Sequence, residues 1–414
     1  MKIRPSAAVL AAVAVIGISA PAVAADSSPS PSGSPALPSG LYGSTDPKYD
    51  GVWRQSLALL AQHTVGVRPA AEAVDWLTGQ QCANGAFAPF RPDASRACDA
   101  KVMVDTNSTA AAVQALAALG GHDAATGKAV SWLKSVQNAD GGWGYAPGGP
   151  SDTNSTSVVI GALAAAGEKP AAVRKGDKSP YDALLAFALP CSGDHAGAGA
   201  FAYQPDKKGK LAANADATAA GVVAALGQGM TARAAQGAGS GGPRCSDSGG
   251  STSARAAANG ASYLTGAVAA NGYLTSVLPG ATDQPDYGNT ADAVVALAAQ
   301  GGAAQARKPL QWLEKHSEAW AKQSGPAAYA QLVFAAHATG TDPRDFGGLD
   351  LVERLNATGP APQKAAGASA EGATDIAKDN STYGIWWGAG ILLVVVIGVG
   401  LLLGRRKGRK VRQP

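Results

Sequence analysis

The chain has 414 residues, 46% of them hydrophobic and 15% charged, with a formal net charge of +4 at pH 7. Eight of its 34 basic residues lie in two terminal segments without acids, 1–25 and 405–414, which leaves 26 basic against 30 acidic residues elsewhere. The body of the chain is therefore slightly acidic and carries no basic stripe, so we expect no nucleic-acid partner.

The N-terminus has the pattern of an export signal. Two basic residues precede an apolar run over residues 7–20, and Ala22-Val-Ala24 supplies the small residues that a signal peptidase needs. We predict a signal peptide over residues 1–25. A Ser/Pro-rich linker over 26–45 follows, because this composition cannot build a core.

Residues 46–358 are expected to form one all-α domain. The segment is rich in Ala, Leu and Val at helical spacing, and the alternation typical of strands is scarce. Twelve helices are expected near 52–63, 69–80, 106–119, 126–137, 153–166, 180–189, 214–227, 252–267, 289–300, 307–321, 326–339 and 347–356.

The sequence repeats itself inside this domain. The segment AVSWLKSVQNADGGWGY, from residue 129, matches AVDWLTGQQCANGAF, from residue 73, without a gap. We interpret the glutamine of each copy as a cap for the next helix, and the aromatic residue after the glycines as a wedge between neighbouring hairpins. The repeat residues are Gln81, Phe87, Gln137 and Trp143, and the weaker copies place Phe201 and Tyr273 at the wedge position.

A polar cluster opens the second half of each repeat. Side-chain oxygens of Asp, Asn, Ser and Thr satisfy the free N–H groups of a first helical turn, so these clusters are typical helix N-caps. Helical hairpins of this length cannot bury their apolar faces alone, whereas stacking them does so. The four clusters begin at Asp105, Asp152, Asn214 and Asp286.

Six such hairpins in a ring form an α/α toroid with six inner and six outer helices. The inner helices begin near 52, 106, 153, 214, 289 and 326. Their N-termini would all face one end of the ring and gather polar groups there, which suits a polar organic ligand. A role as helix caps alone is the alternative. The candidate ligand-binding residues are Asp105, Asn107, Asp152, Asn154, Asn214, Asp216, Asp286 and Tyr287, with Tyr145, Phe201 and Tyr203 as aromatic neighbours.

The four cysteines lie in loop-like sequence that is expected to face an oxidising compartment. Three pairings are possible, and the positions favour Cys82 with Cys98 and Cys191 with Cys245. Metal ligation is not expected, because the chain has no CxxC or HExxH pattern and only five histidines.

The C-terminus has the pattern of a membrane anchor. After a flexible linker over 359–383, residues 384–404 form an apolar run that is long enough to cross a bilayer. The tail over 405–414 is basic, which favours a cytoplasmic location. We expect a single-pass protein of the cell membrane, with its N-terminal domain outside and its C-terminus in the cytoplasm.

The repeat resembles a known family. The stretch QNADGGWG is similar to the QW motif of squalene and hopene cyclases, within the terpenoid cyclase and protein prenyltransferase superfamily of α/α toroids. The capped helices are also similar to those of transcobalamin and intrinsic factor, which use the toroid to bind cobalamin. Both resemblances imply the toroid fold, and they imply different activities.

The residues argue against the cyclase activity. Such enzymes protonate an alkene with the central Asp of a D-x-D-D-T-A motif, and Asn107 stands at that place in this chain. An amide cannot donate that proton, so we expect no catalytic residue, unless the third copy, with Asp216 at the equivalent place, serves a cyclase. The zinc site of the prenyltransferases has no counterpart here.

The sequence therefore predicts an exported, membrane-tethered binding protein that captures a small polar ligand at the cell surface for uptake. The resemblance to transcobalamin makes a corrinoid the sharpest candidate for the ligand, and no cofactor is required. The small β-domain that closes over cobalamin in that family has no place in this chain, so partners would be an uptake transporter or a separate lid protein. The alternatives are a terpenoid cyclase-like enzyme and a structural or protein-interaction module of the cell envelope.

Overall fold

The computed structural model describes residues 37–192, 196–236, 244–250, 252–277 and 283–364, all within the unit that begins at Leu37. Six helices alternate along the chain with the others and are α1 (Gly51–Thr64), α3 (Thr106–Leu119), α5 (Thr153–Ala165), α7 (Ala215–Ala225), α9 (Tyr287–Gly301) and α12 (Pro326–Thr339). The remaining elements are α2 (Ala71–Gly79), α4 (Asp123–Ser135), α6 (Pro180–Ala186), α8 (Ser253–Ala267), α10 (Ala303–His316), α11 (Glu318–Ser324), α13 (Leu351–Asn356), a 3-10 turn at Pro170–Ala172, and the antiparallel strands β1 (Leu274–Thr275) and β2 (Pro285–Asp286).

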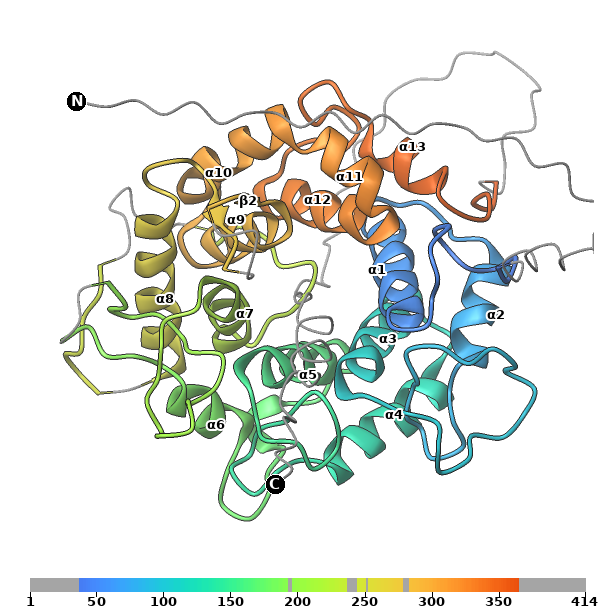
Figure 1. The fold of residues 1–414 in the computed structure, drawn as a ribbon, viewed down its shortest axis with the longest axis horizontal. Helices are drawn as coiled ribbons and strands as arrows, with labels where there is room; N and C mark the ends of the chain where they lie inside the picture. Colours follow the sequence, from blue (N-terminus) through green and yellow to red (C-terminus); the bar gives the residue numbers. More distant parts are fainter. Residues whose placement is uncertain (1–36, 193–195, 237–243, 251, 278–282, 365–414) are drawn as a thin grey trace, which may run out of the picture. The chain divides into compact units, whose positions relative to one another are not determined.

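The six alternating helices form a closed inner ring. Each of them packs against the next, in the order α1, α3, α5, α7, α9 and α12, and α12 returns to pack against α1 (Figure 1). The other helices lie outside this ring and pack on the inner helices next to them in sequence. The all-α class is thus confirmed, and the helices expected to be inner are the ones that close the ring.

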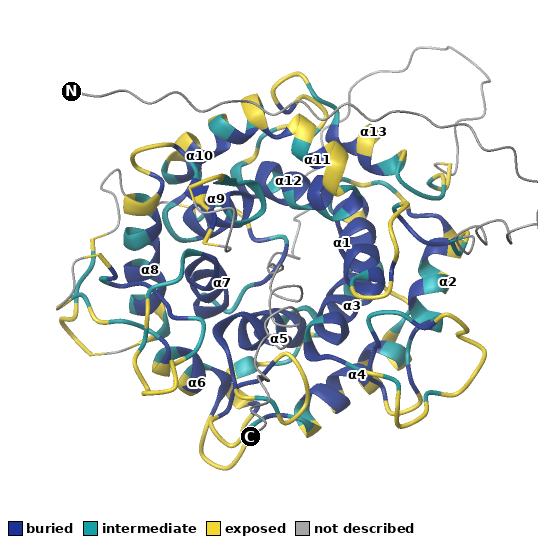
Figure 2. Cartoon of the chain, viewed as in Figure 1, coloured by how far each residue is buried: buried dark blue, intermediate teal, exposed yellow. Residues whose placement is uncertain are grey.

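Burial explains why the two kinds of helix differ in sequence. Inner helices are surrounded on every side, and all residues of α5 from Thr153 to Leu163 are buried (Figure 2). Outer helices bury one face only, as in α4, where Ala129, Trp132 and Leu133 are buried and Lys134 is not. Glycine allows the closest contacts, because a Cβ added to Gly221 would lie 2.8 Å from the ring of Phe201.

The structure differs from the expected number of helices in one hairpin. A single outer helix was expected over 307–321, whereas the chain forms α10 and then α11, with Ser317 between them. Ser317 is buried; it is the C-cap residue of α10, where its N–H bonds to the carbonyl of Leu313, and also the N-cap residue of α11.

The predicted terminal segments lie outside the described residues. These are the signal peptide (1–25), the membrane helix (384–404) and the basic tail (405–414), together with most of both linkers. Among the helices that the structure describes, none combines the length and apolar character that crossing a bilayer requires.

A threonine hydrogen bond recurs in four inner helices. Each threonine lies four residues after the N-cap, and its hydroxyl accepts the N–H of a buried wedge residue from the preceding turn. The fourth wedge is Leu274, which is 3% exposed, and the expectation of Tyr273 is wrong by one residue. The four pairs are Thr109 with Phe87 (2.9 Å), Thr156 with Trp143 (3.1 Å), Thr218 with Phe201 (2.9 Å) and Thr290 with Leu274 (3.0 Å).

The repeated glutamines close the glycine turns. The Nε2 of Gln137 donates to the carbonyl of Gly141 (2.8 Å), and that of Gln81 donates to the carbonyls of Gly85 (3.0 Å) and Ala125 (2.8 Å). The predicted capping role of Gln81 is therefore wrong, because its amide donates to a carbonyl of α4, whereas a cap accepts a free N–H.

Both expected disulfides are present. Cys82 is bonded to Cys98 and Cys191 to Cys245, so the pairing favoured from sequence is confirmed.

The threonine bond can be tested by replacing Thr156, which is fully buried. Thr156→Val keeps the shape of the side chain and leaves the N–H of Trp143 without an acceptor, so we expect the free energy of unfolding to fall by about 1–3 kcal/mol. Urea unfolding measures this change. Thr156→Ser keeps the hydroxyl and is the control, and a valine variant as stable as the serine variant would contradict the assignment.

Candidate ligand-binding rim

The N-termini of four consecutive inner helices lie together at one end of the ring. The N-caps of α3, α5, α7 and α9 each accept the backbone N–H three residues later. These bonds join Asp105 to Ser108 (2.6 Å), Asp152 to Ser155 (2.6 Å), Asn214 to Ala217 (2.8 Å) and Asp286 to Asn289 (3.1 Å). We call this end the polar rim, made up of Asp105, Asn107, Asp152, Asn154, Asn214, Asp216, Asp286, Asp292 and Gln331.

In α3, α5 and α7 the second residue after the cap carries a polar side chain that does not cap the helix. In α5 this residue is Asn154, whose Nδ2 donates to Oδ2 of Asp216 in α7 (2.7 Å). The equivalent residue in α9 is Gly288, and the acid on that helix is Asp292, one turn further along. Its Oδ2 accepts from Nε2 of Gln331 in α12 (3.2 Å), so the hydrogen bonds link side chains of four inner helices in two pairs.

Asp292 and Gln331 are rim residues that the sequence reasoning missed. Asp292 is 1% exposed and stands alone in the apolar run Ala291 to Ala299, six residues after the N-cap. A lone acid inside a run that must be buried is the signal that points to it, because a buried carboxyl needs a partner.

Burial raises the pKa values of the rim carboxyls. Burial is the largest cause at Asp216, whose pKa rises to about 7, with added repulsion from Asp286 and Asp152. It also raises the pKa values of Asp105 and Asp152, each to about 6. The pKa of Asp292 is raised well above its usual range by burial and by the nearby Asp216.

Among the described residues, no basic side chain forms an ion pair with this acidic cluster. Near neutral pH the cluster therefore holds a mixture of protonated and ionised carboxyls, and a protonated carboxyl can donate as well as accept a hydrogen bond.

Five buried oxygens of the rim have no hydrogen-bond partner among the described residues. Leaving a buried acceptor unpaired costs about 1–3 kcal/mol, so such atoms are usually satisfied by an ordered water or by a ligand. All five lie on cap residues or on the second residue after the cap. They are Oδ2 of Asp105 and Asp152, Oδ1 of Asp216, and the Oδ1 atoms of Asn107 and Asn154.

The aromatic candidates divide into two groups. Tyr145 is 42% exposed and Tyr203 is partly exposed. Both lie near rim carboxyls. Burial raises the pKa of each tyrosine most, and nearby carboxylates raise it further, Asp105 at Tyr145 and Asp152 and Asp216 at Tyr203. Phe201 is fully buried as a wedge and is closed to a ligand. Tyr287 lies between the rings of Trp312 (4.9 Å) and Trp320 (5.5 Å).

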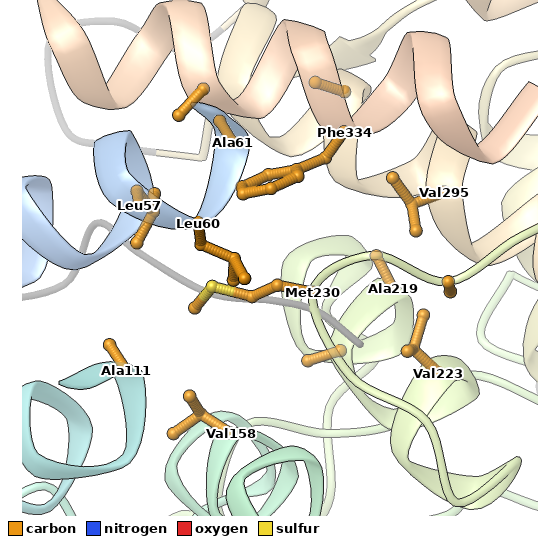
Figure 3. Close-up of a cluster of buried hydrophobic side chains, with 14 of the residues drawn as sticks. Leu57, Leu60, Ala61, Ala111, Val158, Ala219, Val223, Met230, Val295 and Phe334 are labelled. Carbon is orange, nitrogen blue, oxygen red and sulfur yellow. The ribbon is translucent and has the colours of Figure 1, made fainter. Parts of the chain in front are cut away.

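Apolar side chains fill the centre of the ring behind the rim. Met230, Leu60 and Phe334 point toward one another there and are at most 1% exposed (Figure 3). Met230 belongs to residues 227–236, which we call the crossing segment, because it runs over the C-terminal ends of the inner helices. Its contacts include Gln114 of α3 and Ala298 of α9. A ligand at the rim would therefore lie on a closed floor.

Among the described residues, no group of three or more His, Cys, Asp or Glu side chains has the geometry to hold a metal ion.

Comparison with known proteins places the fold only loosely. No protein-family description and no curated protein matches the chain. Similar solved structures include terpene cyclases: ent-copalyl diphosphate synthase from Streptomyces platensis (17% identity, TM-score 0.44, covering 70% of this chain and 50% of that one) and the type II terpene cyclase MstE from Scytonema (13%, 0.42, 66% and 73%). A sugar epimerase from a ruminal bacterium is similar to the same degree (13%, 0.45, 74% and 93%). The chain spans about half the length of the synthase, and likenesses this distant decide nothing about activity.

The raised pKa of Asp216 predicts how stability depends on pH. The folded state holds this proton up to about pH 7, whereas the unfolded chain releases it near pH 4, so the free energy of unfolding should fall as pH rises between these values. Asp216→Asn keeps the shape and the bond to Asn154 and removes the titration. The difference in free energy of unfolding between the variant and the native chain should therefore be more favourable to the variant at pH 8 than at pH 4, by on the order of 2–4 kcal/mol.

Urea unfolding at both pH values measures this difference. Asp75→Asn, at an exposed position, is the matched control and should leave the dependence unchanged. Equal pH dependence in the native chain and in the Asp216 variant would show that the carboxyl titrates normally.

Proposed function

We propose that this protein binds a small polar organic ligand, rich in N–H or O–H donors, at the polar rim. The five unpaired rim oxygens carry the proposal, because the two amide oxygens accept hydrogen bonds and the three carboxyl oxygens accept them when ionised. The unpaired carboxyls and the raised pKa of Asp216 favour a neutral or cationic ligand over an anion.

A corrinoid is the candidate that we put first. Its ring carries several primary carboxamides, whose N–H groups suit a circle of carboxyl and amide acceptors. Tyr145 and Tyr203 would supply flat apolar contacts at the edge of the rim. Since the floor behind the rim is closed, the ligand would rest on the mouth of the ring and leave a face open to a partner, such as an uptake transporter or a separate lid protein.

The location follows from the same proposal. The two disulfides support an oxidising compartment outside the cytoplasm. An export signal would direct the ring out of the cytoplasm, and a C-terminal membrane helix would hold it near the cell surface, where a scarce ligand is captured for uptake.

A terpenoid cyclase-like activity is the second candidate, and one observation favours it. Asp216 is a buried carboxyl with a pKa near 7 beside an apolar interior, which is the environment that a general acid for an alkene needs. Two observations weigh against it: Asn107 stands at the motif position of the acid, and Met230, Leu60 and Phe334 occupy the space that a folded polyene would need.

The binding proposal predicts a ligand-dependent gain in stability. Cyanocobalamin, squalene and an oligosaccharide are each added to the full-length protein, and the unfolding temperature is recorded. We expect cyanocobalamin to raise it, because a ligand at 100 times its Kd adds about 2.7 kcal/mol to the folded state. Asn107→Leu should weaken the affinity for cyanocobalamin about tenfold, and so reduce the rise in unfolding temperature, since it removes one unpaired acceptor.

Gln300→Leu is the matched control. Gln300 also has an unpaired buried amide oxygen on an inner helix, at the C-terminal end of α9, away from the rim. Equal losses in the two variants, or no stabilisation by any of the three compounds, would refute rim binding. Conversion of squalene that is abolished by Asp216→Asn would establish the second candidate instead.

A further inference from the structure

A cavity lies at the opposite end of the ring from the polar rim. It has a volume of about 510 Å³ and is bounded by the C-terminal ends of α1 and α12, by the crossing segment, and by the loop after α12. Thr64 and Val65 come from the first of these elements and Gly340 from the second. We call it the basic cavity, for the reason that follows.

The residues that line the basic cavity include two arginines and no acid. Arg233 belongs to the crossing segment and Arg344 to the loop after α12, and neither forms an ion pair in the described part of the chain. Asp342 and Asp345 are the nearest acids in sequence to Arg344. Their Oδ1 atoms accept backbone N–H groups, of Arg344 (2.9 Å) and of Gly348 (3.2 Å).

His337 holds Arg233 in place without neutralising it. The Nε of Arg233 donates to Nε2 of His337 (3.1 Å), so the imidazole accepts this bond in its neutral form. Burial, and then the charge of Arg233, lower the pKa of His337 to about 4. Because Arg233 uses its Nε in this bond, its two terminal NH₂ groups remain as donors for a ligand.

Arg344 likewise has free N–H donors on its guanidinium group. Within the described part of the chain its side chain donates one hydrogen bond, a long one from Nη2 to the carbonyl of Val65 (3.5 Å). Both guanidinium groups are exposed and border the same cavity, which is large enough for a small organic anion.

We propose that the basic cavity binds a small molecule through a carboxylate or phosphate group. Arginine matches the planar geometry of these groups with paired N–H donors. The helix C-termini around the cavity direct carbonyl oxygens and negative dipole ends toward it, which oppose an anion. Binding therefore depends on the two arginines, and the toroid carries an anion site that is separate in place and in charge from the rim.

The test uses the full-length protein and two probes, inorganic phosphate and succinate, which distinguish the phosphate from the carboxylate source. Titration calorimetry at constant ionic strength gives the affinity of each. We expect at least one probe to bind the native chain, and Arg233→Gln and Arg344→Gln each to weaken that binding about tenfold or more.

Arg307→Gln is the matched control, since it removes the same charge from an exposed helix position outside the cavity. It should bind the probe as the native chain does. The proposal is overturned if neither probe binds, if either cavity variant binds normally, or if the control loses as much as they do. Unfolding curves of the variants without probe confirm that each is folded. Asp216→Asn should leave anion binding intact, which separates this result from the outcome at the rim.

Discussion

The structure depends on the bond between a threonine hydroxyl and the N–H of a wedge residue. The bond fixes the first turn of an inner helix against the end of the preceding glycine turn, at Thr109, Thr156, Thr218 and Thr290. A second contact reaches the next hairpin, where the carbonyls of Tyr145 and Tyr203 accept the first N–H groups of α3 and α5. These bonds set the first turns of the inner helices at one level around the ring. The polar side chains of these turns lie together because the hydrogen bonds prevent the helices from shifting along their axes.

The sequence predicted the features that repeat. Helix caps, wedges and the glutamine-glycine turn recur at fixed spacing, and a ring of hairpins follows from stacking units that cannot bury their apolar faces alone. Features that occur once were missed. Asp292 stands where the other copies have Ala or Val, and Met230 lies in a glycine-rich segment that has no helical pattern. Tyr273 was predicted as the fourth wedge because the other wedges are aromatic, whereas the buried residue at this position is Leu274.

Charge is distributed unevenly between the two ends of the ring. Carboxyls at the rim are buried without cations, and their protonation offsets part of the repulsion. At the other end, the crossing segment brings Arg233 to His337, a pairing between residues 104 positions apart that no local pattern indicates. The floor formed by Met230 keeps the two ends apart, so each can differ in the chemistry of what it contacts.

The closure of α12 on α1 bears on the order in which the protein can assemble. An open arc of the first five inner helices would leave apolar sides of α1 and α9 exposed to solvent, because α12 packs against both of them. Native packing of the first hairpin thus requires residues near 330, almost 280 positions later. A chain that emerges N-terminus first cannot complete its structure stepwise, and it must be kept from aggregating until nearly all of the domain has been delivered.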